Sequence, residues 1–235
     1  MKNNNAWLIT AKSNLHVGNE NTSSYGLIDK AVQRDALTGL PCINSSSLKG
    51  ALNEYCSVVA GLSPTDRIEI FGVDKKNKNS STKKGLYTFF DANILFLPIQ
   101  GKDKLYSLVT TRSILKAYSE KMQLFDIAVE PDVNRLLDKL KIALDINNIT
   151  IDFVSDSEFI ELCSDEELPI IARNCLEDGQ SVNLWYEQVL PQETVFYTLM
   201  LAEVDKLSSV LDKKIIQIGA NATIGYGYCR FNKIV

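Results

Sequence analysis

Two polar side chains near the start of the chain have the chemistry of proton transfer. Asp29 lies in the stretch "SSYGLIDKAVQRD" (23–35), and His16 is the only histidine of the sequence. A carboxylate can accept a proton from a hydroxyl or hold a divalent cation, and an imidazole can transfer protons near neutral pH. Taken alone, a loop aspartate is usually solvated and a single histidine is usually structural. Their residue types therefore allow catalysis without establishing it.

Two further stretches have the residue types that bind phosphate. The segment "SSSLKG" (45–50) opens a predicted helix, where free backbone N–H groups, hydroxyls and a lysine suit an anion. The segment "IGANATIGYGY" (218–228) is rich in glycine, which lets a ligand approach backbone N–H groups closely. Helix capping and a tight turn between strands would explain the same residues. The candidates are Ser46, Ser47 and Lys49 in the first segment and Gly219, Asn221, Thr223 and Gly225 in the second.

The charge of the chain is distributed unevenly. A length of 235 residues fits one large domain, 1–235, and its net charge of −4 argues, taken alone, against a nucleic-acid binder. However, residues 1–122 hold 16 Lys+Arg against 10 Asp+Glu, whereas residues 123–235 hold 9 against 19. The first half can therefore present a basic face. Part of this excess lies in the Lys-rich segment 74–84, which is predicted to be a flexible loop.

Cysteine usage and hydropathy indicate the compartment. The five cysteines are odd in number and form no CxxC pair, which is typical of a reduced, cytoplasmic protein. The start "MKNNNAWLITAK" lacks the apolar core of a signal peptide, and no apolar run reaches the length of about 18 residues that spans a membrane. A cytoplasmic protein without a membrane segment is expected.

The order of the predicted elements indicates an α+β fold. A strand (6–17) is followed by a helix (44–62), a two-strand hairpin, inserted material, a strand (194–203), a helix (204–214) and final strands. This is the βαββαβ order of a ferredoxin-like (RRM-like) fold with insertions. The hairpin is expected at 85–99 and 104–112, and the insertions at 113–122, 131–144 and 155–163 (helices) and 149–154, 170–176 and 182–187 (strands).

Three stretches in this order resemble a known family. They are "LHVGNENTSSYGLIDKAVQRDALTGLPCINSSSLKGAL", "WYEQVLPQETVFYTLML" and "IQIGANATIGYGYCRF". Together they resemble the RAMP superfamily of CRISPR-associated proteins, and most closely the repeating backbone subunit of type III effector complexes of the Cmr type (III-B-like). The related Csm-type subunit shares the first and last motifs but is less similar at "LPQETVFY".

The resemblance implies a function for each element. Copies of such a subunit line up along a CRISPR RNA with other type III subunits, and cut single-stranded target RNA paired with it at regular intervals, in antiviral defence. It implies that Asp29 is the cleavage residue and a candidate ligand of a divalent ion, Mg or Mn. It also implies a protruding β-hairpin, the thumb, at about 168–187. The RNA-binding residues would be His16, Arg34, Ser46, Ser47, Lys49, Gly219, Asn221, Thr223 and Gly225, and the thumb residues Ile171, Leu176, Leu184 and Trp185.

Two alternatives remain open at this point. The subunit could be purely architectural and bind guide RNA without cutting, although Asp29 stands where such a subunit would need no acid. It could instead be a guide-processing endonuclease of the same superfamily, for which His16 would be the only histidine available as a general base.

Overall fold

The main sheet places seven strands side by side. A computed structural model of the chain describes residues 3–18, 28–73, 83–101, 103–146, 148–178 and 180–234; most of the predicted flexible loop, 74–84, lies outside these ranges. In spatial order the strands are β10 (Ile215–Gln217), β11 (Tyr228–Lys233), β1 (Asn3–Ala11), β9 (Val195–Ala202), β4 (Ala92–Gln100), β5 (Tyr106–Thr110) and β6 (Ile151–Phe153). Two short strands, β2 (Cys42–Ile43) and β3 (Thr88–Phe89), pair with β4 and β9.

The four strands β11-β1-β9-β4 form the centre of this sheet. Each is antiparallel to its neighbours. Helix α1 (Ser45–Val58) lies between β1 and β4 in the chain, and the short helix α6 (Ser208–Leu211) lies between β9 and β11. The predicted α+β class is therefore confirmed, and the elements β1, α1, β4, β9, α6 and β11 follow one another in a βαββαβ order. However, the predicted hairpin partner β5 lies outward of β4, and β9 takes the place next to β1.

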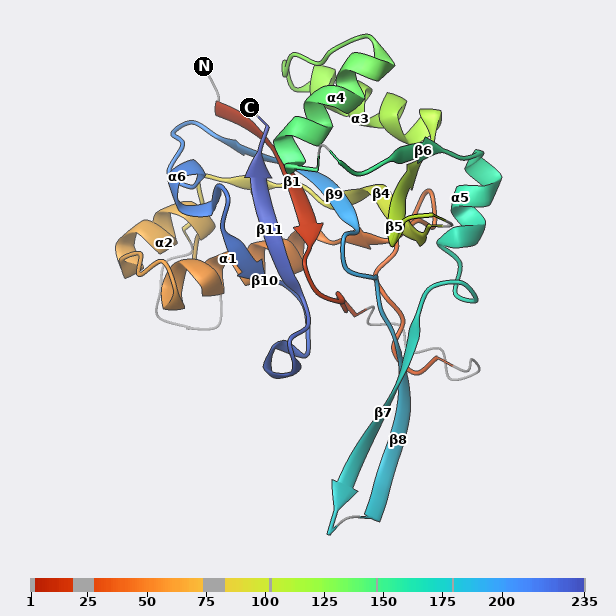
Figure 1. Ribbon diagram of the computed structural model, residues 1–235. Coiled ribbons are helices and arrows are strands. Elements are labelled where there is room, and N and C mark those ends of the chain that lie inside the picture. The colour runs from red at the N-terminus through yellow and green to blue at the C-terminus, as the bar shows by residue number, and fades with distance from the viewer. Residues whose placement is uncertain are drawn as a thin grey trace.

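Both faces of the sheet are covered because its strands alternate. Along β1, Trp7 and Ile9 belong to one hydrophobic cluster, and Ala6 and Leu8 belong to another. The first cluster includes side chains of α1 and α2 (Pro64–Phe71), and the second includes those of α3 (Arg112–Leu124) and α4 (Val133–Leu144). Figure 1 shows these two helix pairs on opposite sides of the sheet.

One helix was not predicted, and two others begin or end at different residues from those predicted. Helix α2 was not predicted, although Ser63 caps it through the Asp66 N–H and Pro64 stands in its first turn. Helix α4 begins at Val133 with Asp132 as its cap, so Pro131 precedes the helix. Helix α6 is shorter than the predicted 204–214 at both ends; it ends at Leu211, and the backbone of Asp212 after it is extended.

A long hairpin leaves the body of the protein. Strands β7 (Ile170–Glu177) and β8 (Gln180–Gln188) pair only with each other in the strand assignment and follow helix α5 (Asp156–Leu162). Figure 1 shows this hairpin projecting below the sheet, beside the connection between β10 and β11. This hairpin occupies the part of the chain, about 168–187, for which a protruding thumb was predicted. None of the described helices is long and apolar enough to cross a membrane.

Candidate functional site

Asp29 lies against strand β8 at the base of the hairpin. Its backbone N–H donates to the Tyr186 carbonyl oxygen over 3.0 Å, and the Tyr186 N–H donates to Asp29 Oδ2 over 2.8 Å. The residue is exposed, and no other described residue bonds to its second carboxylate oxygen, Oδ1. The carboxylate is therefore held through one oxygen, while the other has no hydrogen-bond partner among the described residues.

The residues after Asp29 run along β8 and anchor its position. The Gln188 N–H donates to the Lys30 carbonyl oxygen at 2.9 Å, and the Val32 N–H donates to the Gln188 side chain at 3.1 Å. Arg34 ends this segment with two charge-assisted contacts, to the Cys163 carbonyl at 2.8 Å and to Asp165 at 2.7 Å. Its guanidinium is thus engaged within the protein, and an RNA contact by Arg34 stays a prediction.

His16 is buried beneath the same strand. Only 2% of its surface is exposed, and its Nδ1 lies 2.7 Å from the Gln188 carbonyl oxygen. A carbonyl oxygen only accepts, so Nδ1 must carry the hydrogen. The ring therefore holds the end of β8 in place, which disfavours His16 as the general base of a guide-processing enzyme.

The glycine-rich loop reaches the hairpin base from the other side. It connects β10 to β11 through the short helix η1 (Ala222–Ile224), and Asn221 Nδ2 donates to Glu187 Oε2 over 2.8 Å. Gly219 has a φ of 81°, and a Cβ built on it would lie 2.3 Å from the His16 carbonyl oxygen. Thr223 and Gly225 are exposed. The Asp29 segment and this loop therefore contact neighbouring residues of β8, Tyr186 and Glu187, at the hairpin base.

Glu187 stands where these segments meet, and no sequence pattern pointed to it. Its side chain is only 1% exposed and accepts hydrogen bonds from Lys30 and Trp185 in addition to Asn221. Burial by itself raises the pKa of this carboxyl, but the bonds from Lys30 and Trp185 outweigh it and hold the pKa below its usual value. The carboxylate therefore stabilises the fold above the ordinary pKa of glutamate, and this contribution is lost as pH falls through the lowered pKa.

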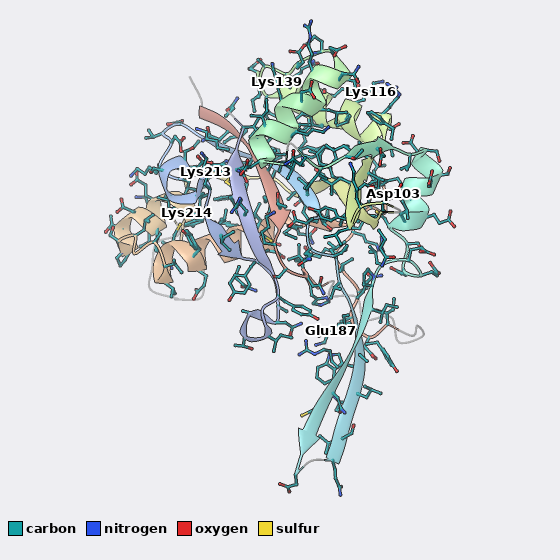
Figure 2. The ribbon with its side chains drawn as sticks, viewed as in Figure 1. Asp103, Lys116, Lys139, Glu187, Lys213 and Lys214 are labelled. Carbon is teal, nitrogen blue, oxygen red and sulfur yellow. The ribbon has the colours of Figure 1, made fainter. Side chains whose placement is uncertain are left out.

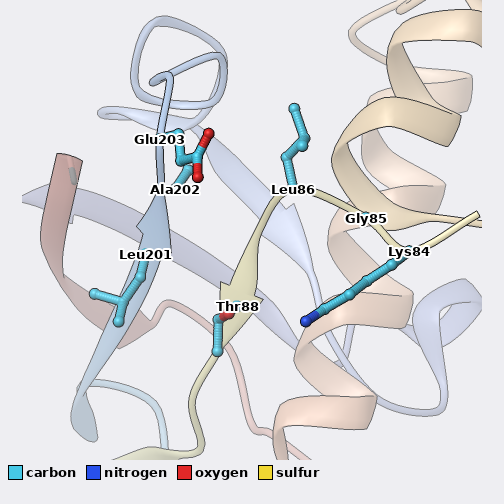
Figure 3. Close-up of a pocket in the computed structure, with 7 residues that line it drawn as sticks. All are labelled: Lys84, Gly85, Leu86, Thr88, Leu201, Ala202 and Glu203. Carbon is cyan, nitrogen blue, oxygen red and sulfur yellow. The ribbon is translucent and has the colours of Figure 1, made fainter. Parts of the chain in front are cut away.

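A positively charged surface begins at the start of α1. Ser46 and Lys49 are exposed and, with Lys83 and Lys84, line a cavity of about 700 Å³, hereafter the α1 pocket. No carboxylate of the described residues lines it. Lys84 also lines a neighbouring cavity of about 360 Å³ beside strand β3 (Figure 3).

Ser47 connects the α1 pocket to the Asp29 segment. Its hydroxyl accepts a hydrogen bond from Gln33 Nε2 at 3.0 Å, and Gln33 Oε1 accepts from the Asn44 N–H at the start of α1. Gln33 is buried within the segment that pairs with β8. The start of α1 and the exposed Asp29 carboxylate are therefore parts of one continuous framework.

The predicted thumb residues lie in different environments. Leu184 is 54% exposed, and Val182, two residues before it at a register shift of the hairpin, is 53% exposed. Ile171 is half-buried, and Trp185 donates its indole N–H to Glu187 at 3.1 Å. The side chain of Leu176 lies outside the described residues. Val182 was not among the predicted thumb residues, although it is as exposed as Leu184.

The predicted metal has no preformed protein site in the described ranges. No group of three or more histidine, cysteine, aspartate or glutamate side chains comes close enough there to hold an ion. Asp29 contributes a single carboxylate, one oxygen of which already accepts the Tyr186 N–H. The residues present therefore do not by themselves fit a resident metal.

Comparisons with known proteins agree with this architecture. Residues 8–230 match the family model of the RAMP superfamily. The CRISPR system Cmr endoribonuclease Cmr4 of Pyrococcus furiosus is 25% identical over 260 residues, covering 87% of this chain and 88% of that protein.

Two solved structures share the fold over nearly the whole chain. One is the cryo-EM structure of the type III-B Cmr-beta bound to cognate target RNA, with a TM-score of 0.71, 21% identity and coverage of 98% of this chain and 97% of that chain. The other is the crystal structure of oligomeric Cmr4 from Pyrococcus furiosus, with a TM-score of 0.68, 21% identity and coverage of 97% of both chains.

Proposed function

The chain belongs to the RAMP superfamily, and from this we propose that it is a backbone subunit of a type III CRISPR effector that cleaves RNA paired with a guide. The observation that carries the proposal is the exposed Asp29 residue, whose carboxylate is held at the hairpin base through Oδ2 while Oδ1 has no partner among the described residues. A relative aligned over most of both chains is named an endoribonuclease, and a solved structure of the same fold is described as bound to cognate target RNA, which supports the proposal. Its setting is the cytoplasm, in antiviral defence.

The cleavage chemistry needs few protein groups. The 2′-hydroxyl of the target nucleotide attacks the adjacent phosphorus, forming the P–O2′ bond and breaking the P–O5′ bond. The products are a 2′,3′-cyclic phosphate and a free 5′-hydroxyl. Asp29 Oδ1 accepts the proton of the 2′-hydroxyl, and water supplies a proton to the leaving oxygen. Most of the acceleration comes from holding the nucleotide in line, which is why a single acid suffices.

The guide is gripped without reading its sequence. Ser46, Ser47 and Lys49 contact its backbone on one side, and the glycine-rich loop around Asn221 and Thr223 contacts it on the other. Hydroxyls, backbone N–H groups and a few bases suit any guide sequence, because base pairing supplies the specificity. The hairpin inserts its exposed apolar side chains, Leu184 and Val182, into the duplex and displaces a nucleotide next to Asp29.

The decisive experiment uses the assembled complex. The chain, its partner subunits and a guide RNA are combined with a complementary target and with a target carrying one 2′-deoxynucleotide at the cut position. We expect cuts at regular intervals in the first target and loss of the corresponding cut in the second. Guide binding without any cleavage would favour the architectural alternative, in which the subunit only carries the guide.

The lysines of the α1 pocket are expected to contact phosphates. Replacing Lys83 and Lys84 together by alanine should weaken guide binding and reduce the slope of log K against log salt by about 0.7 for each phosphate that is no longer neutralised. Lys116→Ala is the matched control, because Lys116 is 76% exposed and lies on α3, far from the hairpin (Figure 2). If the salt dependence of guide binding is unchanged in the double variant, the guide RNA does not contact the α1 pocket.

Removal of divalent ions tests the metal predicted from the sequence. Since the described residues form no metal cluster, no step above is assigned to an ion. A requirement for a divalent ion predicts that EDTA abolishes target cleavage and that Mg²⁺ restores it. The metal-free step with Asp29 as the base predicts full cleavage in EDTA, and guide binding should persist in EDTA in both cases. Cleavage products and guide affinity are measured on the same complex.

A further inference from the structure

The buried carboxylate of Glu187 joins three segments that are distant in the chain. It lies where the hairpin meets the body, as Figure 2 shows. It accepts hydrogen bonds from Lys30 Nζ at 2.9 Å, from Trp185 Nε1 at 3.1 Å and from Asn221 Nδ2 at 2.8 Å. One of these donors follows Asp29, one is on the hairpin, and one is in the glycine-rich loop.

Cations and aromatic rings enclose this carboxylate. Lys30 Nζ lies 5.3 Å from the centre of the Trp185 ring. The Arg173 guanidinium lies 5.9 Å from the centres of both the Trp185 and Tyr226 rings, with one nitrogen 3.6 Å from Glu187 Oε2. A buried charge is tolerated only when it is paired and hydrogen-bonded in this way. We call these residues the Glu187 cluster: Lys30, Arg173, Trp185, Glu187, Asn221 and Tyr226.

The Glu187 cluster is coupled directly to Asp29. Tyr186, the residue before Glu187, makes both hydrogen bonds to Asp29, and Lys30, the residue after Asp29, makes the ion pair with Glu187. These two neighbouring contacts, Asp29 with Tyr186 and Lys30 with Glu187, fix the Asp29 segment along β8. Without the ion pair, the backbone bonds of Asp29 and Lys30 to Tyr186 and Gln188 would remain, but no side-chain contact would tie this segment to Glu187 and the glycine-rich loop.

We propose that Glu187 is a positioning residue for RNA cleavage, which holds Asp29 and the glycine-rich loop in register on the hairpin base. Glu187 itself is buried and touches no RNA. Trp185 belongs to the Glu187 cluster through its indole N–H, so it helps to position Asp29 and does not insert between bases. The inference rests on the proposed function of Asp29 as the cleavage residue.

The test is a Glu187→Gln complex assayed under single-turnover conditions with saturating target. Glutamine keeps the volume but removes the charge, and its amide nitrogen opposes the donors that now surround the carboxylate. We expect the cleavage rate to fall about 10- to 100-fold, as displacement of a reacting group by about 1 Å does. Guide affinity should fall much less than the cleavage rate, because only the contacts of the glycine-rich loop are disturbed while Ser46, Ser47 and Lys49 remain in place.

Variants at Lys30 separate positioning from general stability. Lys30→Met should reproduce the loss of rate, and Lys30→Arg should retain most of the rate because it keeps a cation for the carboxylate. The double variant, Glu187→Gln with Lys30→Met, should be no slower than either single variant, since both remove the same interaction. Additive losses, or equal losses in Lys30→Arg and Lys30→Met, would overturn the proposal.

A matched control reports the effect of removing an ion pair elsewhere. Glu69→Gln removes the partner of Lys206 Nζ, 2.6 Å away on α2, and should leave the cleavage rate of folded complex unchanged. If Glu187→Gln cleaves at the wild-type rate while cleavage still depends on Asp29, only the positioning role fails. If cleavage does not depend on Asp29 at all, the proposed function fails first.

Discussion

A complex assembled with Asp29→Asn is expected to bind guide and target RNA normally and to cleave the target about 10²- to 10⁴-fold more slowly, the range typical of removing a general base. Asparagine keeps an oxygen that accepts the Tyr186 N–H, which donates to Asp29 Oδ2 at 2.8 Å in the native chain. The substitution therefore removes the charge and preserves the contact with β8. The measurement is single-turnover cleavage with guide affinity determined in parallel.

Comparison with Asp29→Ala distinguishes chemistry from structure. Alanine removes both the charge and the hydrogen bond, so the two variants should be equally slow if the carboxylate acts on RNA. If Asp29 only holds the loop, Asp29→Asn should cleave nearly as fast as wild type, and only Asp29→Ala should be impaired. Asp103→Asn, at another exposed loop aspartate distant from the hairpin, should be silent (Figure 2).

Gly219→Ala is expected to lower the free energy of unfolding by about 3 kcal/mol. A residue with a side chain at its φ of 81° is itself strained by about 1–2 kcal/mol. In addition, the new Cβ would stand 2.3 Å from the His16 carbonyl oxygen, which is backbone and cannot simply rotate away. That carbonyl also accepts a hydrogen bond from the Ala220 N–H at 3.0 Å, and moving the loop away from the new Cβ would break this bond.

Gly225→Ala provides the control within the same loop. Its φ is 85°, but no atom of the described residues lies within 4 Å of a Cβ built there. It should therefore lose only the conformational part, about 1–2 kcal/mol. Urea unfolding of the two variants measures the difference. Equal losses would show that the close approach to His16 contributes nothing to stability.

Local patterns were sufficient for the element types and for several boundaries. Alternation and capping residues correctly indicated most strands and helices, including α5 with its Ser155 cap. The order of strands in the sheet could not be predicted from local patterns, because β9 pairs with both β1 and β4 through contacts between segments far apart in the chain. Propensity reports what one segment prefers, whereas strand neighbours are set by burial of both sheet faces.

The sequence by itself determined which residues were candidates and which family the motifs resemble. It placed Asp29 in a loop, Lys49 at a helix start and Asn221 in a glycine-rich turn. Only the tertiary structure decided that Asp29 pairs with Tyr186, that His16 and Arg34 are engaged within the protein, and that Glu187 joins three segments. The reason is physical: a hydrogen bond depends on distance and burial, and both are fixed only when segments far apart in the chain pack together.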